Sequence, residues 1–210
     1  MREDMWEMED SAYREGFAVV AGADEAGRGP LAGDVYAAAV VLPRGTVIAG
    51  LDDSKRLAAR TRERLFRDIS ERAEAYGVAS ASVREIEERN ILGATYLAMN
   101  RALGALLSAP EIAKAVSDGR FLALIDGNRN AGIEYRSRTV VKGDSRLASI
   151  AAASILAKVS RDRYMDALAA RYPGYGFERN RGYGTAEHYA ALRELGATPE
   201  HRKLFLRKMH

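Results

Sequence analysis

The chain has 210 residues, of which 47% are hydrophobic and 29% are charged, so it is long enough for one domain with a sizeable core. No apolar run reaches the ~18 residues that a membrane-spanning helix needs. The absence of cysteine excludes disulfides and thiolate metal sites, and three histidines make a zinc centre a poor candidate. The acidic residues 1–10 lack the apolar core of a secretory signal, so we expect a cytoplasmic protein. The net charge is only +3, but a sequence pI of about 9.1 and an uneven distribution of charge weakly favour a polyanionic partner.

The first part of the chain predicts one short helix and then several strands. Residues 2–14 can form an amphipathic helix, and the apolar run at 17–24 reads as a buried strand. A second strand of small and β-branched residues at 35–42 is stopped by Pro43, and a third short strand is expected at 46–48. Three strands with short connections indicate an antiparallel meander.

The middle of the chain is mainly helical by its periodicity. A polar loop at 51–56 precedes an expected helix at 60–75 and a strand at 78–82. Residues 84–107 read as helix with a break near Asn90 and Gly93, and Pro110 opens another short helix.

Two short apolar runs in the second half predict strands that end in acidic turns. They span residues 121–125 and 139–141, and a long helix is expected over 145–171. The basic segment 171–210 then contains expected helices at 185–195 and after Pro199. We therefore expect a single α/β domain over residues 1–210, with a small helical segment at its C-terminal end.

A glycine-rich stretch after the first strand, residues 21–33, contains two carboxylates and a cation. Side chains alternate along a strand, so Asp24 and Glu25 can serve one site only where the chain leaves regular pairing. Their oxygens suit Mg²⁺ or Mn²⁺, and Gly27-Arg28-Gly29 offers N–H groups and a guanidinium for phosphate. A charged surface turn is the alternative interpretation of this stretch.

Other acidic residues follow later strands, and each has a plain interpretation. Asp126 suits a turn, Asp144 suits a helix N-cap, and Asp162 suits an exposed helix carboxylate paired with an arginine. Residues at strand ends nevertheless gather at one edge of a mixed sheet, and clustered carboxylates need cations. One or two Mg²⁺ ions there could clamp a phosphodiester for attack by water.

Several motifs in order across nearly the whole chain resemble those of ribonuclease HII, the bacterial type 2 ribonuclease H. They are DEAGRGPLAG (24–33), DDSKRL (52–57), LIDGN (124–128), VKGDS (141–145), ASIAAASILAKVSRDR (148–163), RGYGT (181–185) and HR (201–202). The resemblance implies a ribonuclease H-like fold with a mixed five-stranded sheet flanked by helices. It also implies hydrolysis of the RNA strand of RNA–DNA hybrids and nicking 5′ of single ribonucleotides in duplex DNA, leaving 3′-hydroxyl and 5′-phosphate ends.

The resemblance also assigns roles to residues. Asp24, Glu25, Asp126 and Asp144 would be catalytic carboxylates that hold Mg²⁺ or Mn²⁺, with Asp162 as an auxiliary member. Ribose and phosphate recognition would fall to a second set: Gly27, Arg28, Gly29, Tyr183, Lys55, Lys142 and Arg181. Tyr183 would pack against the sugar of the next, deoxy nucleotide. The C-terminal segment 171–210 would complete the substrate groove, and Ser149 and Ser154 are expected to be packing residues.

Some features depart from the family pattern or leave alternatives open. Asp34 and Tyr36 stand where the family more often has Pro and a small apolar residue, and we expect Asp34 to point away from the site. Arg28 and the short segment before the first strand disfavour ribonuclease HIII. A catalytically silent nucleic-acid-binding protein and another metal-dependent phosphoryl-transfer enzyme remain alternatives, although no P-loop follows the glycines. We expect a monomer, and residues 203–207 are too short and generic to indicate a sliding-clamp motif.

Overall fold

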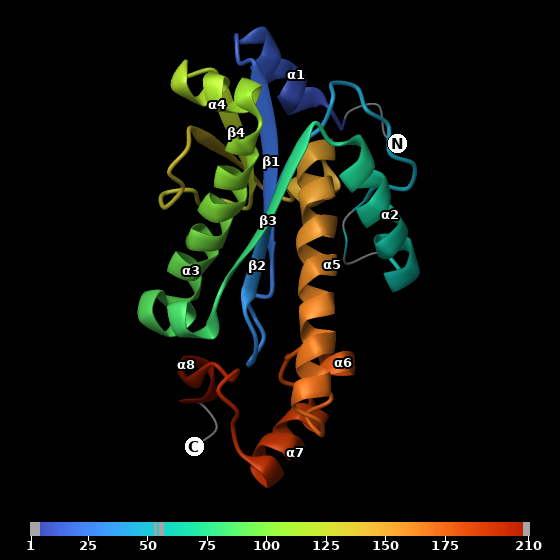
Figure 1. The fold of residues 1–210 in the computed structure, drawn as a ribbon, viewed down its shortest axis with the longest axis vertical. Helices are drawn as coiled ribbons and strands as arrows, with labels where there is room; N and C mark the ends of the chain where they lie inside the picture. Colours follow the sequence, from blue (N-terminus) through green and yellow to red (C-terminus); the bar gives the residue numbers. More distant parts are fainter. Residues whose placement is uncertain (1–4, 53, 55–56, 208–210) are drawn as a thin grey trace.

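The computed structural model describes residues 5–52, 54 and 57–207, and its centre is one five-stranded sheet in the order β3-β2-β1-β4-β5 (Figure 1). The strands are β1 (Val19–Ala26), β2 (Val35–Val41), β3 (Ala75–Ala81), β4 (Phe121–Asp126) and β5 (Ser137–Val140). The first three strands pair antiparallel, whereas β1–β4 and β4–β5 pair parallel. This is the mixed sheet that the sequence motifs implied.

Antiparallel pairing of the first strands is confirmed, but the three-stranded meander with short connections is wrong: the third strand, β3, is the one expected at 78–82, and it follows β2 only after α2. Residues 46–48 form no strand, and β3 instead pairs with the whole of β2, from Val35↔Ala81 to Val41↔Ala75. This pairing leaves no edge of β2 for residues 46–48. The apolar residue Ile48 of this run packs into the core beside α2 (Ala59–Arg72) rather than into the sheet.

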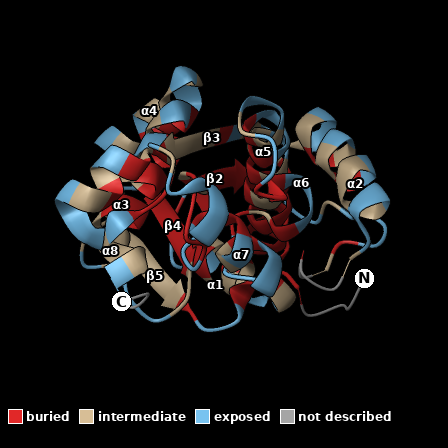
Figure 2. Ribbon diagram, turned by 90° about the horizontal axis from the view of Figure 1, so that it is seen from below, coloured by how far each residue is buried: buried red, intermediate tan, exposed pale blue. Residues whose placement is uncertain are grey.

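Helices cover both faces of the sheet (Figures 1 and 2). The long helix α5 (Ala148–Arg171) packs on β1 and β2 with α2 outside it, and α3 (Val83–Ala105) covers β2 and β3 on the opposite face. Close approach of α5 requires a glycine on β1, because a Cβ at Gly22 would lie 2.3 Å from the carbonyl carbon of Ser149. None of the helices in the described part of the chain is both long and apolar enough to cross a membrane.

The remaining helices largely match their expected positions. They are α1 (Glu7–Arg14), α4 (Pro110–Ser117), α6 (Phe177–Asn180), α7 (Ala186–Leu195) and α8 (Lys203–Leu206). The expected break in α3 is at Asn90, whose φ is 59° and whose side chain accepts hydrogen bonds from the N–H groups of Leu92 and Gly93. Pro110 is at the start of α4, as expected.

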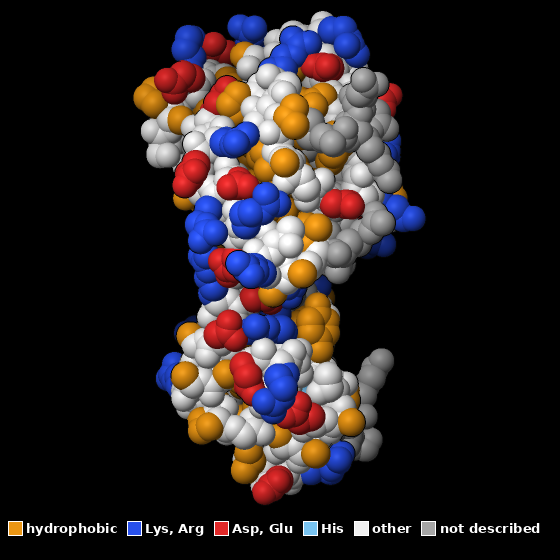
Figure 3. All heavy atoms as spheres, turned by 90° about the vertical axis from the view of Figure 1, so that its right-hand side faces the viewer, with side chains coloured by type: hydrophobic (Ala, Val, Ile, Leu, Met, Phe, Trp, Pro, Cys, Tyr) orange, Lys and Arg blue, Asp and Glu red, His pale blue; other side chains and the backbone are white. Residues whose placement is uncertain are grey.

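The chain after α5 folds back toward the end of β1 and forms a separate lobe. Figure 3 shows that the surface narrows above this lobe and that Lys and Arg side chains gather near the narrowing. A backbone bridge between Ala32 and His201 and a hydrogen bond from Leu31 N–H to Gly182 C=O join the lobe to the loop after β1. The C-terminal segment therefore lies beside the glycine-rich stretch.

Candidate active site

Three carboxylates converge where β1 and β4 end. One oxygen each of Asp24, Asp126 and Asp144 lies within 4.8 Å of the other two. Asp24 and Asp126 come from neighbouring parallel strands, and Asp144 lies in a short 3₁₀ turn (Gly143–Ser145) after β5. The N–H of Gly143 donates a 2.7 Å hydrogen bond to Asp126, which brings the turn against the strand end. The parallel pairing of β1, β4 and β5 thus gathers these side chains.

The interpretation of Asp144 as a helix N-cap is wrong. Helix α5 begins at Ala148, and its N-cap is Leu147, which makes no side-chain capping bond. Asp144 instead lies buried in the preceding 3₁₀ turn, with its carboxylate in the acidic cluster. The turn intervenes because Gly143, whose Cβ would lie 2.5 Å from Ile150, allows the chain to pass close to α5 before the helix begins.

Electrostatics in the cluster favour a divalent cation. Burial, followed by the charges of Glu25 and Asp126, raises the pKa of Asp24 well above its usual range. Hydrogen bonds from Glu25 N–H and from Ser154 favour the ionised carboxylate, but they do not offset these effects. Hard carboxylate oxygens are the ligands that Mg²⁺ and Mn²⁺ prefer, and a bound cation relieves the repulsion between them. The donor set therefore fits the metal that the sequence motifs imply.

Glu25 borders this cluster but does not belong to the three-carboxylate group. Its pairing with β2 stays regular at Glu25↔Ala37, whereas pairing of β1 with β4 ends at Ala23↔Ile125. The expected loss of regular pairing therefore occurs on one side of β1 only. The Glu25 carboxylate lies 3.3 Å from the Arg28 guanidinium and lines the cavity that also contains Asp24 and Asp126.

The loop after β1 is held from inside by two buried arginines. Arg202 donates to four carbonyls of this loop, those of Gly27, Arg28, Pro30 and Gly33. Arg161 donates to the carbonyls of Ala32, Asp34 and Arg181. Gly27 has a φ of 96°, and a Cβ there would lie 1.9 Å from Nε of Arg161, so both the backbone angle and the space require glycine.

Sequence reasoning did not assign a role to Arg161 or Arg202, although both lie in matched motifs. Their exposed fractions are 1% and 0%. Burial lowers the pKa of both guanidinium groups, and together with the charge of Arg161 it brings the pKa of Arg202 to about 9, so Arg202 stays cationic at neutral pH. A basic residue in a polar motif is ordinarily exposed, so only the folded arrangement indicates this role.

A cavity of about 240 Å³ joins the carboxylates to the glycine-rich loop and to Tyr183. Most of the residues to which the motifs assign a role line this cavity, together with several other residues. The lining residues are Asp24, Glu25, Ala26, Gly27, Arg28, Gly29, Ser54, Asp126, Ser154, Lys158, Arg161 and Tyr183. A Cβ at Gly29 would lie 3.4 Å from the Tyr183 ring, so the loop and the tyrosine face each other closely.

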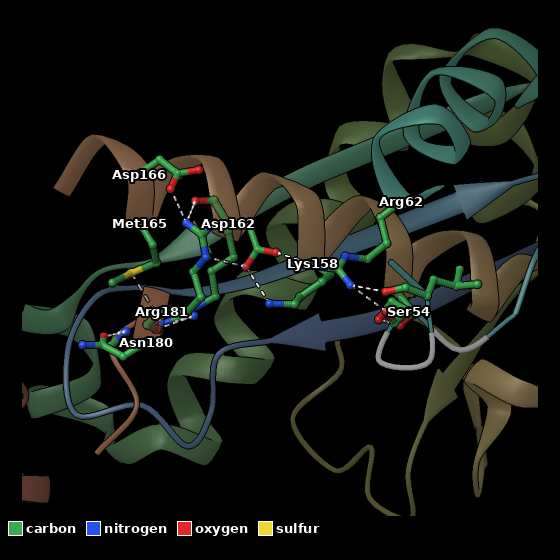
Figure 4. Close-up of polar contacts among 12 residues, drawn as sticks. Ser54, Arg62, Lys158, Asp162, Met165, Asp166, Asn180 and Arg181 are labelled. Atoms are coloured by element: carbon green, nitrogen blue, oxygen red, sulfur yellow. Dashed lines mark hydrogen bonds and ion pairs between the residues drawn. The ribbon is translucent and has the colours of Figure 1, made fainter. Parts of the chain in front are cut away.

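Asp162 lies outside the three-carboxylate group and is matched by cations instead (Figure 4). Lys158 Nζ lies 2.5 Å from its carboxylate, and guanidinium nitrogens of Arg62 and Arg181 lie at 3.4 and 3.9 Å. Its side chain is 14% exposed, so the interpretation as an exposed carboxylate is wrong, and its arginine partners are the sequence-distant Arg62 and Arg181 rather than the neighbouring arginines of the helix. Arg62 also donates to the carbonyls of Ser54 and Leu57, so this group joins α5 to that loop.

The other basic residues expected to contact phosphate have different positions. Arg181 bonds the carbonyl of Asp162 and the carboxylate of Asp166 and does not line the cavity. Lys142 is exposed, with a φ of 57°, directly before the turn that contains Asp144. Lys55 lies outside the described residues.

Two serines and Asp34 have structural partners that the sequence did not indicate. Ser154 lines the cavity, bonds Asp24 and lies 2.8 Å from the Ser54 hydroxyl, so the expectation of a packing role alone is wrong. Ser149 donates to Glu9 in the interior. Asp34 accepts hydrogen bonds from Val83 N–H and the Ser80 and Tyr164 hydroxyls and does not line the cavity.

Two solved structures that match this architecture are ribonucleases H. The ribonuclease H2 of Pyrococcus horikoshii matches 91% of this chain and 96% of its own, with a TM-score of 0.72 and 26% identity. RNase HII of Archaeoglobus fulgidus, solved in a complex with PCNA, matches 88% and 94%, with a TM-score of 0.65 and 24% identity. The sheet and the acidic cluster define a metal-dependent nuclease of ribonuclease H-like fold.

Sequence comparison narrows this class to one family. The family model described as Ribonuclease HII matches residues 21–210. Ribonuclease HII 1 of Methylibium petroleiphilum is 54% identical over 187 residues, which are 89% of each chain. Ribonuclease HII of Burkholderia pseudomallei is also 54% identical over 89% of this chain and 83% of its own. The chain belongs to the ribonuclease HII family and is a type 2 ribonuclease H, a metal-dependent endonuclease.

Proposed function

We propose that this protein hydrolyses the RNA strand of RNA–DNA hybrids and nicks duplex DNA on the 5′ side of single embedded ribonucleotides. The observation that carries the proposal is the shared cavity, in which the loop Gly27-Arg28-Gly29 and Tyr183 face each other beside Asp24 and Asp126. Only the 2′-hydroxyl distinguishes a ribonucleotide from its neighbours, so short contacts next to the reacting phosphate are what this selection needs.

The carboxylates Asp24, Glu25, Asp126 and Asp144 would hold Mg²⁺ or Mn²⁺. When bound, the metal supplies an activated water and stabilises the leaving oxyanion, so that the products carry 3′-hydroxyl and 5′-phosphate ends. The Arg28 side chain is half exposed at the cavity and suits a phosphate oxygen. Tyr183, with 47% of its surface exposed, offers its ring to the sugar of the next nucleotide.

The surrounding segments would extend the grip on the duplex. We place residues 1–210 in one catalytic domain, whose C-terminal segment after residue 171 completes the substrate groove. Lys142, Lys55 and Arg181 are proposed phosphate contacts, Arg181 after exchange of its present carboxylate partner. Asp162 acts as an auxiliary residue by keeping Lys158 beside the cavity.

We propose a cytoplasmic monomer; PCNA is a partner of the archaeal protein, and our proposal for this chain involves nucleic acid and metal alone.

A labelled duplex with one ribonucleotide tests the activity directly. We expect one nick 5′ of the ribonucleotide with Mg²⁺ or Mn²⁺, no cut with EDTA, and an intact all-DNA control. Binding without cleavage in either metal would instead support a catalytically silent nucleic-acid-binding protein, and hydrolysis of free nucleotides would support a different phosphoryl-transfer enzyme.

The Arg28→Ala variant tests ribose selection. We expect cleavage at the single ribonucleotide to fall by about tenfold, the equivalent of one charge-assisted hydrogen bond, while affinity for all-DNA duplex changes little. If affinity for the all-DNA duplex fell as much as cleavage at the single ribonucleotide, this result would contradict a role for Arg28 in ribose selection.

A further inference from the structure

Tyr183 is held from behind by two buried histidines that the proposed chemistry does not use. Nδ1 of His188 lies 2.9 Å from the Tyr183 carbonyl oxygen, and Nε2 of His188 lies 3.0 Å from Nε2 of His201. Nδ1 of His201 lies 2.9 Å from the N–H of Thr198. The exposed fractions of the two histidines are 0% and 2%. A continuous chain of hydrogen bonds therefore runs from Thr198 to Tyr183.

Backbone groups at the two ends of this chain determine where the protons lie. The Thr198 N–H can only donate, so Nδ1 of His201 accepts and His201 carries its proton on Nε2. That proton is donated to Nε2 of His188. The Tyr183 carbonyl can only accept, so His188 carries its proton on Nδ1. Each ring is neutral, and each has one defined tautomer.

The surroundings of the pair favour these neutral rings. The ring centroids of Tyr175 and His201 lie 5.1 Å apart, and those of Phe177 and His188 lie 5.4 Å apart. Aromatic enclosure removes water from both imidazoles, which disfavours a positive charge on either. A second proton on His188 would also direct two N–H groups at each other across the 3.0 Å contact.

The same pair also contacts the loop on the other side of the cavity. His201 forms a backbone bridge with Ala32, and the next residue, Arg202, donates to the carbonyls of Gly27 and Arg28. The histidine pair therefore lies between the segment that fixes the glycine-rich loop and the segment that presents Tyr183.

We propose that His188 and His201 are positioning residues that set Tyr183 against the loop Gly27-Arg28-Gly29 and thereby set the preference for a ribonucleotide followed by a deoxynucleotide. The histidines do not touch the reacting atoms; they act through the Tyr183 backbone. This inference rests on the proposed function, because it assumes that Tyr183 reads the sugar next to the ribonucleotide.

The first test measures the tautomers without any substrate. The chain has only three histidines, so nitrogen-15 shifts of the imidazole rings can be assigned with the two single His→Gln variants. At neutral pH we expect the proton of His188 on Nδ1 and that of His201 on Nε2. A cationic ring, or the reverse pair of tautomers, would overturn the relay.

The second test uses two variants of His188 with similar loss of ring packing. An Asn side-chain amide falls near the position of Nδ1, so His188→Asn keeps a donor for the Tyr183 carbonyl. A Gln amide falls near Nε2, so His188→Gln loses that donor. We compare kcat/KM on a duplex with one ribonucleotide with kcat/KM on a continuous RNA–DNA hybrid. His188→Gln should lower this ratio by about fivefold, the equivalent of one neutral hydrogen bond, whereas His188→Asn should stay within about twofold of the wild type.

A merely structural role would change both variants alike and both substrates alike, and this result would overturn the inference. Tyr183→Ala tests the role of Tyr183 separately from that of His188. It should lower the same kcat/KM ratio, and His188→Gln should lower it little further in the Tyr183→Ala background. If Tyr183→Ala lowers the kcat/KM ratio and His188→Gln leaves it unchanged, the positioning role of His188 is contradicted, whereas the proposed function is not. A wild-type protein that cuts neither duplex contradicts the proposed function, while the tautomer measurement still tests the relay.

Discussion

At the scale of single residues, the carboxylates that suit a metal ion also repel one another and resist ionisation when no metal is bound. Asp24 is 4% exposed, and burial and neighbouring carboxylates raise its pKa. The side chain that would hold the metal therefore disfavours its own ionised form when the metal is absent. Catalytic carboxylates commonly show this combination.

The Asp24→Asn variant should lose cleavage by about a thousandfold, because metal-bound charge stabilisation contributes several kcal/mol to the transition state. In the absence of metal the variant should unfold at the same or a higher temperature than the wild type, since one buried like charge is removed. Cleavage assays and thermal unfolding with and without Mn²⁺ check both expectations. Asp118→Asn, at an exposed carboxylate that follows α4 and pairs with Lys114, serves as the control. Unchanged cleavage in Asp24→Asn would contradict the assigned site.

Glu9 is a second buried carboxylate, and it is not a member of the acidic cluster. Its Oε1 accepts hydrogen bonds from the Ser149 N–H and hydroxyl, whereas Oε2 has no partner among the described residues. Burial raises its pKa above 4.5. The unfolded chain therefore loses this proton first as pH rises, so stability falls from about pH 4.5 up to the folded pKa and stays lower above it.

Glu9→Gln keeps the oxygen that Ser149 bonds and removes the ionisation. We expect the free energy of unfolding at pH 7 to rise, with less dependence on pH above 4.5, because the variant no longer forms a buried charge. Urea unfolding at pH 5 and pH 7 measures this difference. Glu7→Gln, on the exposed side of α1, should leave the unfolding curve unchanged. A Glu9→Gln protein that is less stable than the wild type at pH 7 would contradict the argument.

At the scale of elements, the loop after β1 depends on one guanidinium from the C-terminal segment. Arg202 donates to four carbonyls, and the five N–H groups of arginine make this number of bonds possible. A lysine has three donors at one point and cannot reach the same carbonyls.

Arg202→Lys should therefore lower the free energy of unfolding by about 3 kcal/mol, because at least one buried carbonyl loses its partner and the charge stays buried. Cleavage should fall as well, because the loop that contains Arg28 loosens. Urea unfolding and single-ribonucleotide cleavage measure the two effects. Arg193→Lys, at an exposed position on α7, should match the wild type in both assays. Equal stability of Arg202→Lys and Arg193→Lys would show that the carbonyl contacts contribute little.

At the scale of the whole molecule, the C-terminal lobe makes stability sensitive to mild acid. Burial, together with His188, lowers the pKa of His201 to about 4 from 6.5 in the unfolded chain. The unfolded state takes up the proton first as pH falls, so stability is complete above pH 6.5 and decreases below it. Between pH 6.5 and pH 5 this single group should cost about 2 kcal/mol.

Urea unfolding of the wild type and of His201→Gln at pH 7 and pH 5 isolates this contribution. The variant lacks the titrating ring, so its stability should fall less between the two pH values, although its stability at pH 7 is lower. The carboxylates titrate in both proteins and cancel in the comparison. The same decrease in both proteins would contradict the buried neutral state of His201.

Local patterns in the sequence determined most of the elements, because periodicity, β-branching and proline act over a few neighbouring residues. The strand of small and β-branched residues after the glycines and the helix that begins at Pro110 are examples. The run at 46–48 shows the limit of this reasoning: its composition suits a strand, but β3 already pairs with β2 along its whole length. Pairing is decided between segments, so no local pattern reports it.

The motifs in the sequence also determined the family and the three carboxylates of the acidic cluster, because binding a hard metal ion requires carboxylate side chains. Only the tertiary structure decided that Asp144 is no helix cap, that Asp162 lies among cations, and that Arg202 holds the loop 175 positions away. The histidine pair behind Tyr183 is likewise formed by folding. Such contacts join distant segments in the interior, where burial makes each unpaired polar group costly, and burial is a property of the packed chain rather than of any stretch of it.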